Sequence, residues 1–277
     1  MEKLKILIPT DFSVQAEFAY LMVKKLEEKI RVDIHFLHVM NVPDTVTVDG
    51  NGNIQTCGEI DVKYVAKQKE IAERNLAKLK VLFGKDINSH FVLGKVTDRI
   101  LNFAESNHFD LIVMGTKGAW GIKEKLSGSE TQIIARKSKI PVLSLMCDRS
   151  DLNVQNILLV HNFNQPAKED LQLMHKLIAA FNTKIHFLQI TLASVDIEKE
   201  TVESNMKMFA ELNNIINYES HLINDKDVEN GVVHFKQMNT MDIVCIGTHG
   251  KGGLFHHSAT EKLINHLFTP IISFHIN

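Results

Sequence analysis

The sequence predicts an α/β protein made of two tandem domains, each a doubly wound, five-stranded parallel sheet. Short apolar runs alternate with longer amphipathic segments, which is typical of parallel β–α units with right-handed crossovers. The pattern also occurs twice. Asp110-Leu-Ile-Val-Met-Gly-Thr-Lys-Gly118 returns 132 residues later as Asp242-Ile-Val-Cys-Ile-Gly-Thr-His-Gly250. This long period indicates a duplicated domain rather than a short structural repeat.

In the first repeat, apolar runs predict strands and helically periodic segments predict helices. Ser13 stands where a helix N-cap is expected, and Gly84 is placed to end a long helix. Residues 41–58 are rich in glycine and polar residues, which predicts an exposed loop outside the core. We expect strands at residues 5–8, 32–39, 87–93, 111–114 and 141–146, and helices at 14–29, 62–82, 98–106 and 130–139.

The second repeat begins after the polar segment 148–153, so we expect domains at residues 1–148 and 153–277. Lys184-Ile-His-Phe-Leu188 matches Asp33-Ile-His-Phe-Leu37 of the first repeat. Further strands are expected at 156–160, 218–223 and 270–274, with helices at 168–180, 197–212 and after residue 258.

The composition of the 277 residues is that of a globular protein, with 44% hydrophobic and 23% charged residues. The net charge of −2 argues against nucleic acid as a partner. No signal peptide or membrane-spanning run is evident, and three scattered cysteines are typical of reduced thiols. We therefore expect a cytoplasmic protein with no membrane partner.

A glycine-rich loop after the fourth strand is the main candidate binding site. It runs from Gly115 through Gly118 and Gly128 to Ser129, and a predicted helix follows. Glycines let backbone N–H groups approach a ligand, and a helix N-terminus adds partial positive charge. Together these features favour phosphate. Taken alone, the loop is equally compatible with a turn that only closes a strand–helix unit.

Polar residues follow neighbouring strands as well. Thr10-Asp11 follows the first strand, and His38-Val39-Met40 ends the second. Ligands of open parallel sheets bind outside the carboxyl ends of the strands, near the point where strand order reverses. Asp11 would contact a ribose hydroxyl or a base edge there, or would only cap the next helix or stabilise the turn. Both interpretations remain open at this point.

The second repeat lacks parts of this pattern. Asn162 stands in place of Asp11, and His161 in place of Thr10. Its loop is three residues shorter, with His257 in place of Gly128. A shorter loop with a side chain at that position should bind a triphosphate less well, although a smaller anion is not excluded.

The spacing Gly-x-x-Gly-(nine residues)-Gly-Ser, together with Pro9-Thr-Asp-Phe-Ser13, resembles the universal stress protein family. The resemblance covers nearly the whole chain as two tandem Rossmann-like copies. It implies ATP as the ligand, with Mg²⁺ as an accompanying ion and ADP or AMP as alternatives. It also implies an intramolecular pseudo-dimer formed through the fifth strands, and leaves a further homo-oligomer open. The implied nucleotide-binding residues are Pro9, Thr10, Asp11, Val39, Met114, Gly115, Gly118, Gly128, Ser129 and Glu130.

The sequence does not support efficient catalysis. The loop is not a Walker A motif, and no magnesium carboxylate, general base or nucleophile elbow is identifiable. We expect no catalytic residue and at most weak ATP hydrolysis. We interpret His249, His256, His257 and His266 as surface or packing residues, so no metal site is predicted. The predicted function is a regulatory, ATP-binding stress protein; a nucleotide-independent scaffold and a slow ATPase are the alternatives.

Overall fold

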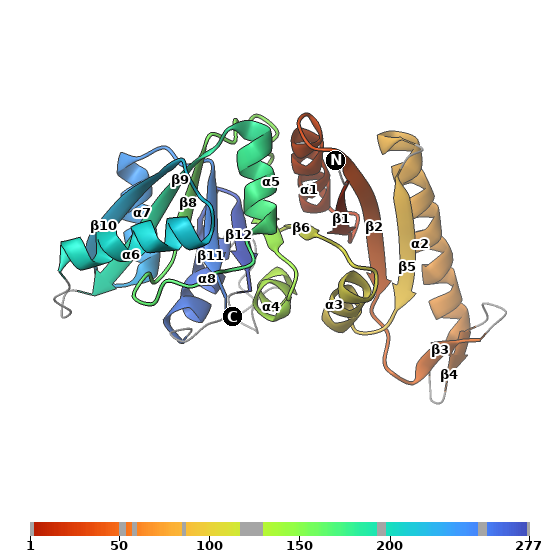
Figure 1. The fold of residues 1–277 in the computed structure, drawn as a ribbon. Coiled ribbons are helices and arrows are strands. Elements are labelled where there is room, and N and C mark those ends of the chain that lie inside the picture. The colour runs from red at the N-terminus through yellow and green to blue at the C-terminus, as the bar shows by residue number, and fades with distance from the viewer. Residues whose placement is uncertain are drawn as a thin grey trace.

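The computed structural model describes residues 3–49, 54–56, 60–84, 87–116, 130–192, 198–248 and 254–275. Its centre is one ten-stranded sheet in the order β10-β9-β8-β11-β12-β7-β6-β1-β2-β5 (Figure 1). Neighbouring strands are parallel except for the central pair β7 and β12, which is antiparallel. The predicted α/β, Rossmann-like class is therefore confirmed.

The first half of the sheet comes from the first repeat. Ser13 caps its first helix by accepting a hydrogen bond from the N–H of Ala16, and Gly84 ends its second helix, both as predicted. The elements are β1 (Leu4–Pro9), α1 (Val14–Glu27), β2 (Val32–Met40), β3 (Val46–Val48), β4 (Ile54–Thr56), α2 (Val62–Phe83), β5 (Asn88–Leu93), α3 (Val96–Ser106), β6 (Leu111–Gly115), α4 (Glu130–Lys137) and β7 (Val142–Leu145).

The second half repeats the same alternation of strands and helices. Its elements are β8 (Asn156–Val160), α5 (Gln172–Phe181), β9 (Lys184–Leu192), α6 (Lys199–Leu212), β10 (Tyr218–Asp225), α7 (Val228–Met238), β11 (Ile243–Gly247), α8 (Leu254–His266) and β12 (Ile271–Phe274). In each half the first strand lies between the second and the fourth, so the strand order reverses beside the first strand.

The halves join through their last strands. β7 pairs with β12, with Leu143 opposite Ile272. The Ser144 hydroxyl donates to the carbonyl of Ile271 at 3.3 Å, so side chains reinforce the ladder. On one face α4 contacts α8, where the Gln132 amide donates to the carbonyl of Glu261 at 2.8 Å. The pairing covers two strand edges that would otherwise be open to aggregation.

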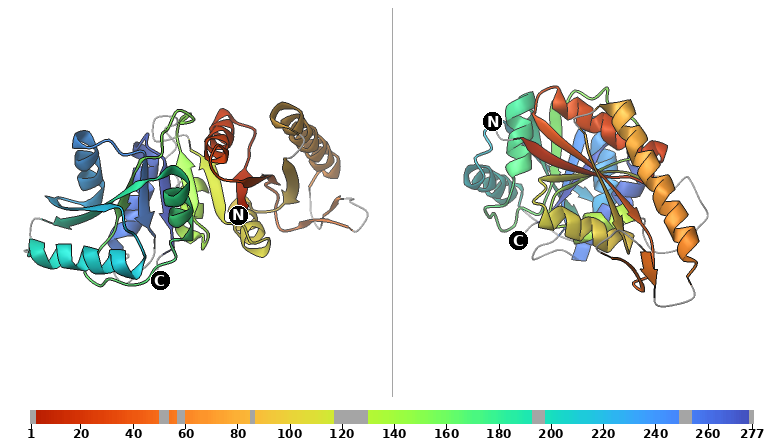
Figure 2. Two further views of the ribbon diagram at one scale, coloured as in Figure 1. Left: turned by 45° about the horizontal axis from the view of Figure 1, so that its top comes forward. Right: turned by 90° about the vertical axis from the view of Figure 1, so that its right-hand side faces the viewer.

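Helices cover both faces of the sheet, which makes three layers (Figure 2). Alternate strand residues point to opposite faces: Ile6 and Ile8 pack toward α1 and α2, whereas Leu7 packs toward α3 and α4. The same division holds in the second half, with α5 and α6 on one face and α7 and α8 on the other. The two core clusters on these faces both run across the two halves, so the halves share their hydrophobic core.

The structure corrects the predicted loop at residues 41–58. Its described part contains the short antiparallel pair β3 and β4, and Val42 and Val46 are buried against Val65 of α2. Polar and glycine residues dominate this segment, but its few valines are enough to pack against Val65 near the start of α2. The prediction that the segment contributes nothing to a core was wrong.

The helix starts that differ most from the prediction are those of α5 and α8. α5 begins at Gln172 rather than at residue 168. Asn213, after α6, explains this because its side chain accepts from the N–H of Glu169 at 2.8 Å and donates to the carbonyl of Ala167 at 2.9 Å. These bonds hold the segment out of the helix. α8 begins at Leu254, so His257 lies in a helix and not in the loop where we expected it.

Candidate functional site

Three neighbouring strand ends form the candidate site. β1 lies between β2 and β6, and all three run parallel, so their carboxyl ends meet at one edge of the sheet. Thr10 and Asp11 follow β1, Val39 lies near the end of β2, and Gly115 ends β6. This edge includes the point between β1 and β6 where strand order reverses, the usual ligand position in open α/β sheets.

Asp11 forms a tight turn between β1 and α1. One of its carboxylate oxygens accepts from the N–H of Ser13 at 3.0 Å. The buried Thr10 hydroxyl accepts from the N–H of Phe12 at 3.0 Å, and Phe12 adopts a positive φ of 63°. The structural role that the sequence left open for Asp11 is therefore present, and it occupies one of the two carboxylate oxygens.

The second half makes the same side-chain hydrogen bond without a charge. The side-chain oxygen of Asn162 accepts from the N–H of Asn164 at 3.1 Å, as Asp11 does from Ser13. The preceding residue is also placed alike, because Thr10 and His161 each donate a backbone hydrogen bond to β2 or β9. A neutral side-chain oxygen thus suffices for this hydrogen bond, and a carboxylate is not required. The negative charge of Asp11 is not explained by the local fold.

Gly115 has a packing role that the sequence did not reveal. A Cβ atom at this position would overlap the backbone carbonyl of Gln15 in the first turn of α1. The missing side chain lets α1 approach the end of β6, which sets the Asp11 turn beside that strand. The hydroxyl of Thr131 donates to the carbonyl of Gly115 at 3.3 Å and ties the start of α4 to the same point.

A histidine missed as a site residue supports the turn from β2. Nδ1 of His38 lies 2.7 Å from the carbonyl oxygen of Thr10, and its ring packs against Phe12 with centroids 4.5 Å apart. Val39 and Met114 are buried in the core, which leaves their backbone groups as the parts closest to a ligand position. His38 directly precedes Val39 at a strand end, which was the available signal.

Glu130 brings a second carboxylate to this edge at the start of α4. The residue as a whole is exposed, but nearby atoms remove water from its carboxyl group. This desolvation, followed by the negative charge of Asp11, raises the pKa of Glu130 above its ordinary value. The two carboxylates therefore lie close enough to repel each other, and an anion at this point would need a compensating cation.

Of the ten predicted binding residues, the structure brings Pro9, Thr10, Asp11, Val39, Met114, Gly115 and Glu130 to this edge of the sheet. The predicted contacts from Gly118, Gly128 and Ser129 lie outside the described residues, as does most of the glycine loop. His249, His256 and His257 are likewise not described at the level of their side chains.

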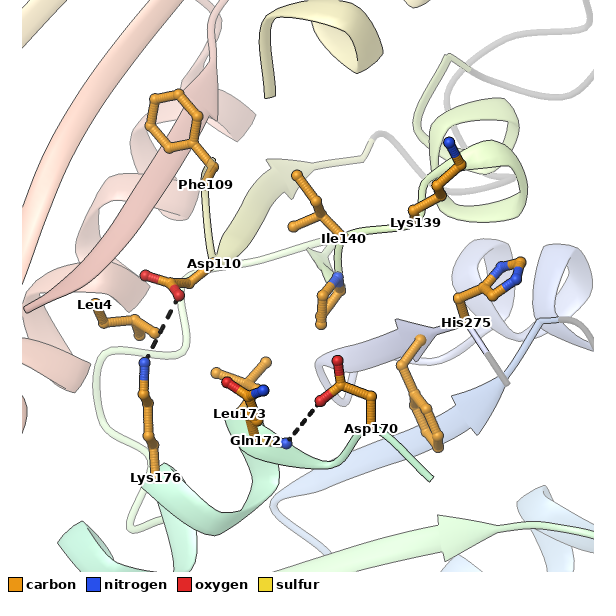
Figure 3. A pocket seen from close by; sticks show the side chains of 12 residues that line it. Leu4, Phe109, Asp110, Lys139, Ile140, Asp170, Gln172, Leu173, Lys176 and His275 are labelled. Atoms are coloured by element: carbon orange, nitrogen blue, oxygen red, sulfur yellow. Dashed lines mark hydrogen bonds and ion pairs between the residues drawn. The ribbon is translucent and has the colours of Figure 1, made fainter. Parts of the chain in front are cut away.

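A cavity of about 200 Å³ lies elsewhere, between the two halves (Figure 3). Asp110 at the start of β6 faces Lys176 of α5, with Oδ1 and Nζ 3.7 Å apart. Asp170, just before α5, accepts a hydrogen bond from the N–H of Gln172. The cavity lies at the amino ends of β1 and β6, the opposite edge from Asp11, and the pair of Asp110 and Lys176 crosses the contact between the halves there.

Comparisons with known proteins agree with this architecture. Residues 4–145 match the model of the universal stress protein family. Universal stress protein MJ0577 of Methanocaldococcus jannaschii is 30% identical over 149 residues, which cover 50% of this chain and 92% of that protein. Universal stress protein MJ0531 of the same organism is 27% identical over 139 residues, 50% of this chain and 79% of that protein.

A solved structure extends the similarity in fold to the whole chain. The crystal structure of a universal stress protein from Archaeoglobus fulgidus has a TM-score of 0.74 and 19% identity, and the match covers 99% of this chain and 96% of the other. Among the described residues, no helix is long and apolar enough to cross a bilayer. The match of the family model to just over half of the chain, on the strands that form the candidate site, establishes that this protein belongs to the universal stress protein family.

Proposed function

We propose that this universal stress protein binds ATP at the carboxyl ends of β1, β2 and β6 and acts as a cytoplasmic regulatory protein. The observation that carries the proposal is the unexplained charge of Asp11, at the switch point of the sheet and beside the strand that leads into the glycine loop. A carboxylate with one oxygen in the turn keeps a second oxygen that can accept a ribose hydroxyl.

The glycine loop would hold the phosphates. Nucleotide-binding members of the family use the glycines and the serine of this motif for that purpose, and here the positions are Gly118, Gly128 and Ser129. Gly115 acts by a different route, because it admits α1 to the end of β6. We assign it to the architecture of the site rather than to direct contact with phosphate.

Mg²⁺ fits the same arrangement. Asp11 and Glu130 already repel each other, so a polyphosphate beside them would be bound poorly without a cation. Mg²⁺ prefers oxygen ligands and commonly joins one or two carboxylates to substrate phosphates. We therefore propose ATP with Mg²⁺ as the ligand, and expect ADP and AMP to depend less on the ion.

Asn162 in the second half supports one nucleotide per chain. That half has the strand ends and the same side-chain hydrogen bond but lacks the carboxylate. We propose domains at residues 1–148 and 153–277, which pair as an intramolecular counterpart of a dimer through β7 and β12. In this arrangement the second domain would cover the edge of the first sheet, and only the first domain would bind nucleotide.

Calorimetry with Mg²⁺-ATP tests the proposal on the intact protein. Asp11→Asn is the sharpest variant because Asn162 shows that an asparagine oxygen can accept the same hydrogen bond. Loss of a charge-assisted hydrogen bond should weaken binding by about tenfold to a hundredfold. The matched control, Asn162→Asp, should leave affinity unchanged. If the intact protein binds no adenine nucleotide, the proposal is wrong and a nucleotide-independent scaffold becomes the better account.

A further inference from the structure

Two histidines and a glutamate meet at the far end of the second half, on β9 and β10 (Figure 1). The cluster consists of His186, Glu219 and His221. One ligand atom from each lies within 4.8 Å of the other two. Among the residues that the structure describes, no other three His, Cys, Asp or Glu side chains converge in this way.

Strand geometry explains the convergence. Glu219 and His221 are two residues apart on β10, so their side chains point to the same face of the sheet. His186 on the parallel strand β9 is in register with Glu219. Nδ1 of His186 lies 3.0 Å from Nε2 of His221 and 4.0 Å from the nearer carboxylate oxygen of Glu219.

We propose that His186, Glu219 and His221 bind a zinc ion. Imidazole nitrogen and carboxylate oxygen are zinc ligands, and three protein ligands leave a fourth position for water. Two nitrogens bound to one tetrahedral zinc lie about 3.3 Å apart, so the imidazole rings need to separate by only a few tenths of an ångström.

The first half provides an internal comparison. His35 and His90 form the same pair there, with Nδ1 and Nε2 2.9 Å apart. The paired histidines are therefore a shared feature of the fold and do not by themselves indicate a metal. The difference is the third residue: Asn88 is in register with His35, where Glu219 is in register with His186. The first half does have a carboxylate nearby, but Asp33 contacts His35 at Nε2, 3.1 Å away, and not at the nitrogen that faces His90. Among the described residues, only the second half brings a carboxylate to the paired nitrogens themselves.

A second contact orients the ring of His186, the buried member of the cluster. Nε2 of His186 lies 3.2 Å from the side-chain oxygen of Asn156, at the start of β8. When Nε2–H donates to this oxygen, Nδ1 carries the lone pair and faces the cluster. Metal-binding histidines usually donate their other ring N–H to such a partner. His186 is 8% exposed, so its ring is also held in place by packing.

Lys184 competes with the metal for the carboxylate. Its ammonium group lies 2.6 Å from the carboxylate of Glu219, and the two side chains are 40% and 48% exposed. Exposed ion pairs contribute little to stability, so the pair can yield to a metal ion. A variant without Lys184 should therefore bind zinc more tightly, because Glu219 would be free to contact the metal.

The test is zinc affinity of the full chain, prepared without a histidine tag and stripped of metal, with Co²⁺ absorption as a report on tetrahedral coordination. His221→Asn should weaken the site by more than about a hundredfold, beyond the effect of losing an outer-shell partner. Glu219→Asn, which installs the residue of the first half, should weaken it by about tenfold or more. Lys184→Met should strengthen binding.

His90→Asn is the matched control, because it breaks the equivalent pair of the first half and should leave zinc affinity unchanged. Thermal melts of all variants separate loss of folding from loss of a ligand. The proposal is overturned if His221→Asn and His90→Asn have equal effects, or if Lys184→Met and Glu219→Asn both leave affinity unchanged. Equal zinc affinity in the parent and in all variants would also overturn it, because the zinc would then be bound by other histidines.

Discussion

The backbone carbonyl of Gln15 occupies the space that a Cβ atom on Gly115 would need. This contact sets the first turn of α1 against the end of β6 and thereby brings the Asp11 turn to the edge of the sheet. A position that sequence reasoning assigned to phosphate is thus required first by the packing of a helix against a strand.

Gly115→Ala should therefore destabilise the protein whether or not nucleotide is present. Backbone atoms cannot rotate away from the added methyl group, so we expect a loss of about 1–3 kcal/mol or more in the free energy of unfolding. Urea denaturation of the nucleotide-free protein measures it. An unchanged midpoint would show that α1 does not need this close approach and would return Gly115 to a role in ligand binding alone.

The His35–His90 pair makes the first half sensitive to acid. Burial, followed by the charges of His35, Lys5 and Lys80, lowers the pKa of His90 in the folded protein. The unfolded chain takes up a proton near pH 6.5, whereas folded His90 resists it until lower pH. Its contribution to stability is therefore present above about pH 6.5 and is lost as the pH falls below that value.

Urea midpoints at pH 7.5 and 5.5 measure this effect, and His90→Asn should reduce the difference between them. His186 and His221 also have lowered pKa values, and they remain in the variant. The pH dependence that the variant retains therefore includes their contribution. A titration of the His90 ring by NMR gives an independent check. A pKa above 6.5 for this ring would contradict the prediction.

The central strand pair should control the stability of the whole chain. Leu143 on β7 is 1% exposed and lies opposite Ile272 on β12. We expect Leu143→Ala to cost about 2–5 kcal/mol, because it leaves a cavity in a core that both halves share. The comparison variant is Arg136→Ala, which removes an exposed ion pair to Glu261 between α4 and α8. Its cost should stay within about 1 kcal/mol. Similar values for the two variants would mean that the strand contact contributes little.

Thiol reactivity should separate two of the cysteines. Cys245 is buried within β11, and this burial raises the pKa of its thiol far above the ordinary value. Cys147, just after β7, is only partly buried. Because the thiolate is the reactive form, iodoacetamide should modify Cys147 in the native protein and Cys245 only after unfolding. Peptide mass spectrometry measures both sites in one sample, and rapid native labelling of Cys245 would contradict its buried position.

Much of the fold could be predicted from local pattern. Strands that are buried on both faces appear as nearly continuous apolar runs, as in Leu111-Ile-Val-Met114, and the duplication repeats them. The segment with Val42 and Val46 could not, because a few valines among glycines and polar residues show no periodicity. Their burial depends on α2, which follows later in the chain.

The candidate sites divide in the same way. Asp11, Val39 and Gly115 each lie within two residues of the carboxyl end of a strand, so their meeting at one edge could be inferred from the strand pattern. His186 and His221 are 35 residues apart on different strands, and nothing in their spacing indicates contact. A repeated Ile-His in the second strand and a Glu-x-His in the third were the only signals, and they acquire meaning only with the strand register.

The sequence alone determined the α/β class, the duplication and the strand ends at which a ligand would bind, because these follow from local apolar patterns and from glycine and polar residues next to them. Only the tertiary structure decided that Gln15 needs the space beside Gly115, that Val42 and Val46 are buried against α2, and that a carboxylate reaches the paired nitrogens of two histidines in the second half. Each of these depends on the register and packing of segments far apart in the chain, which no local pattern records.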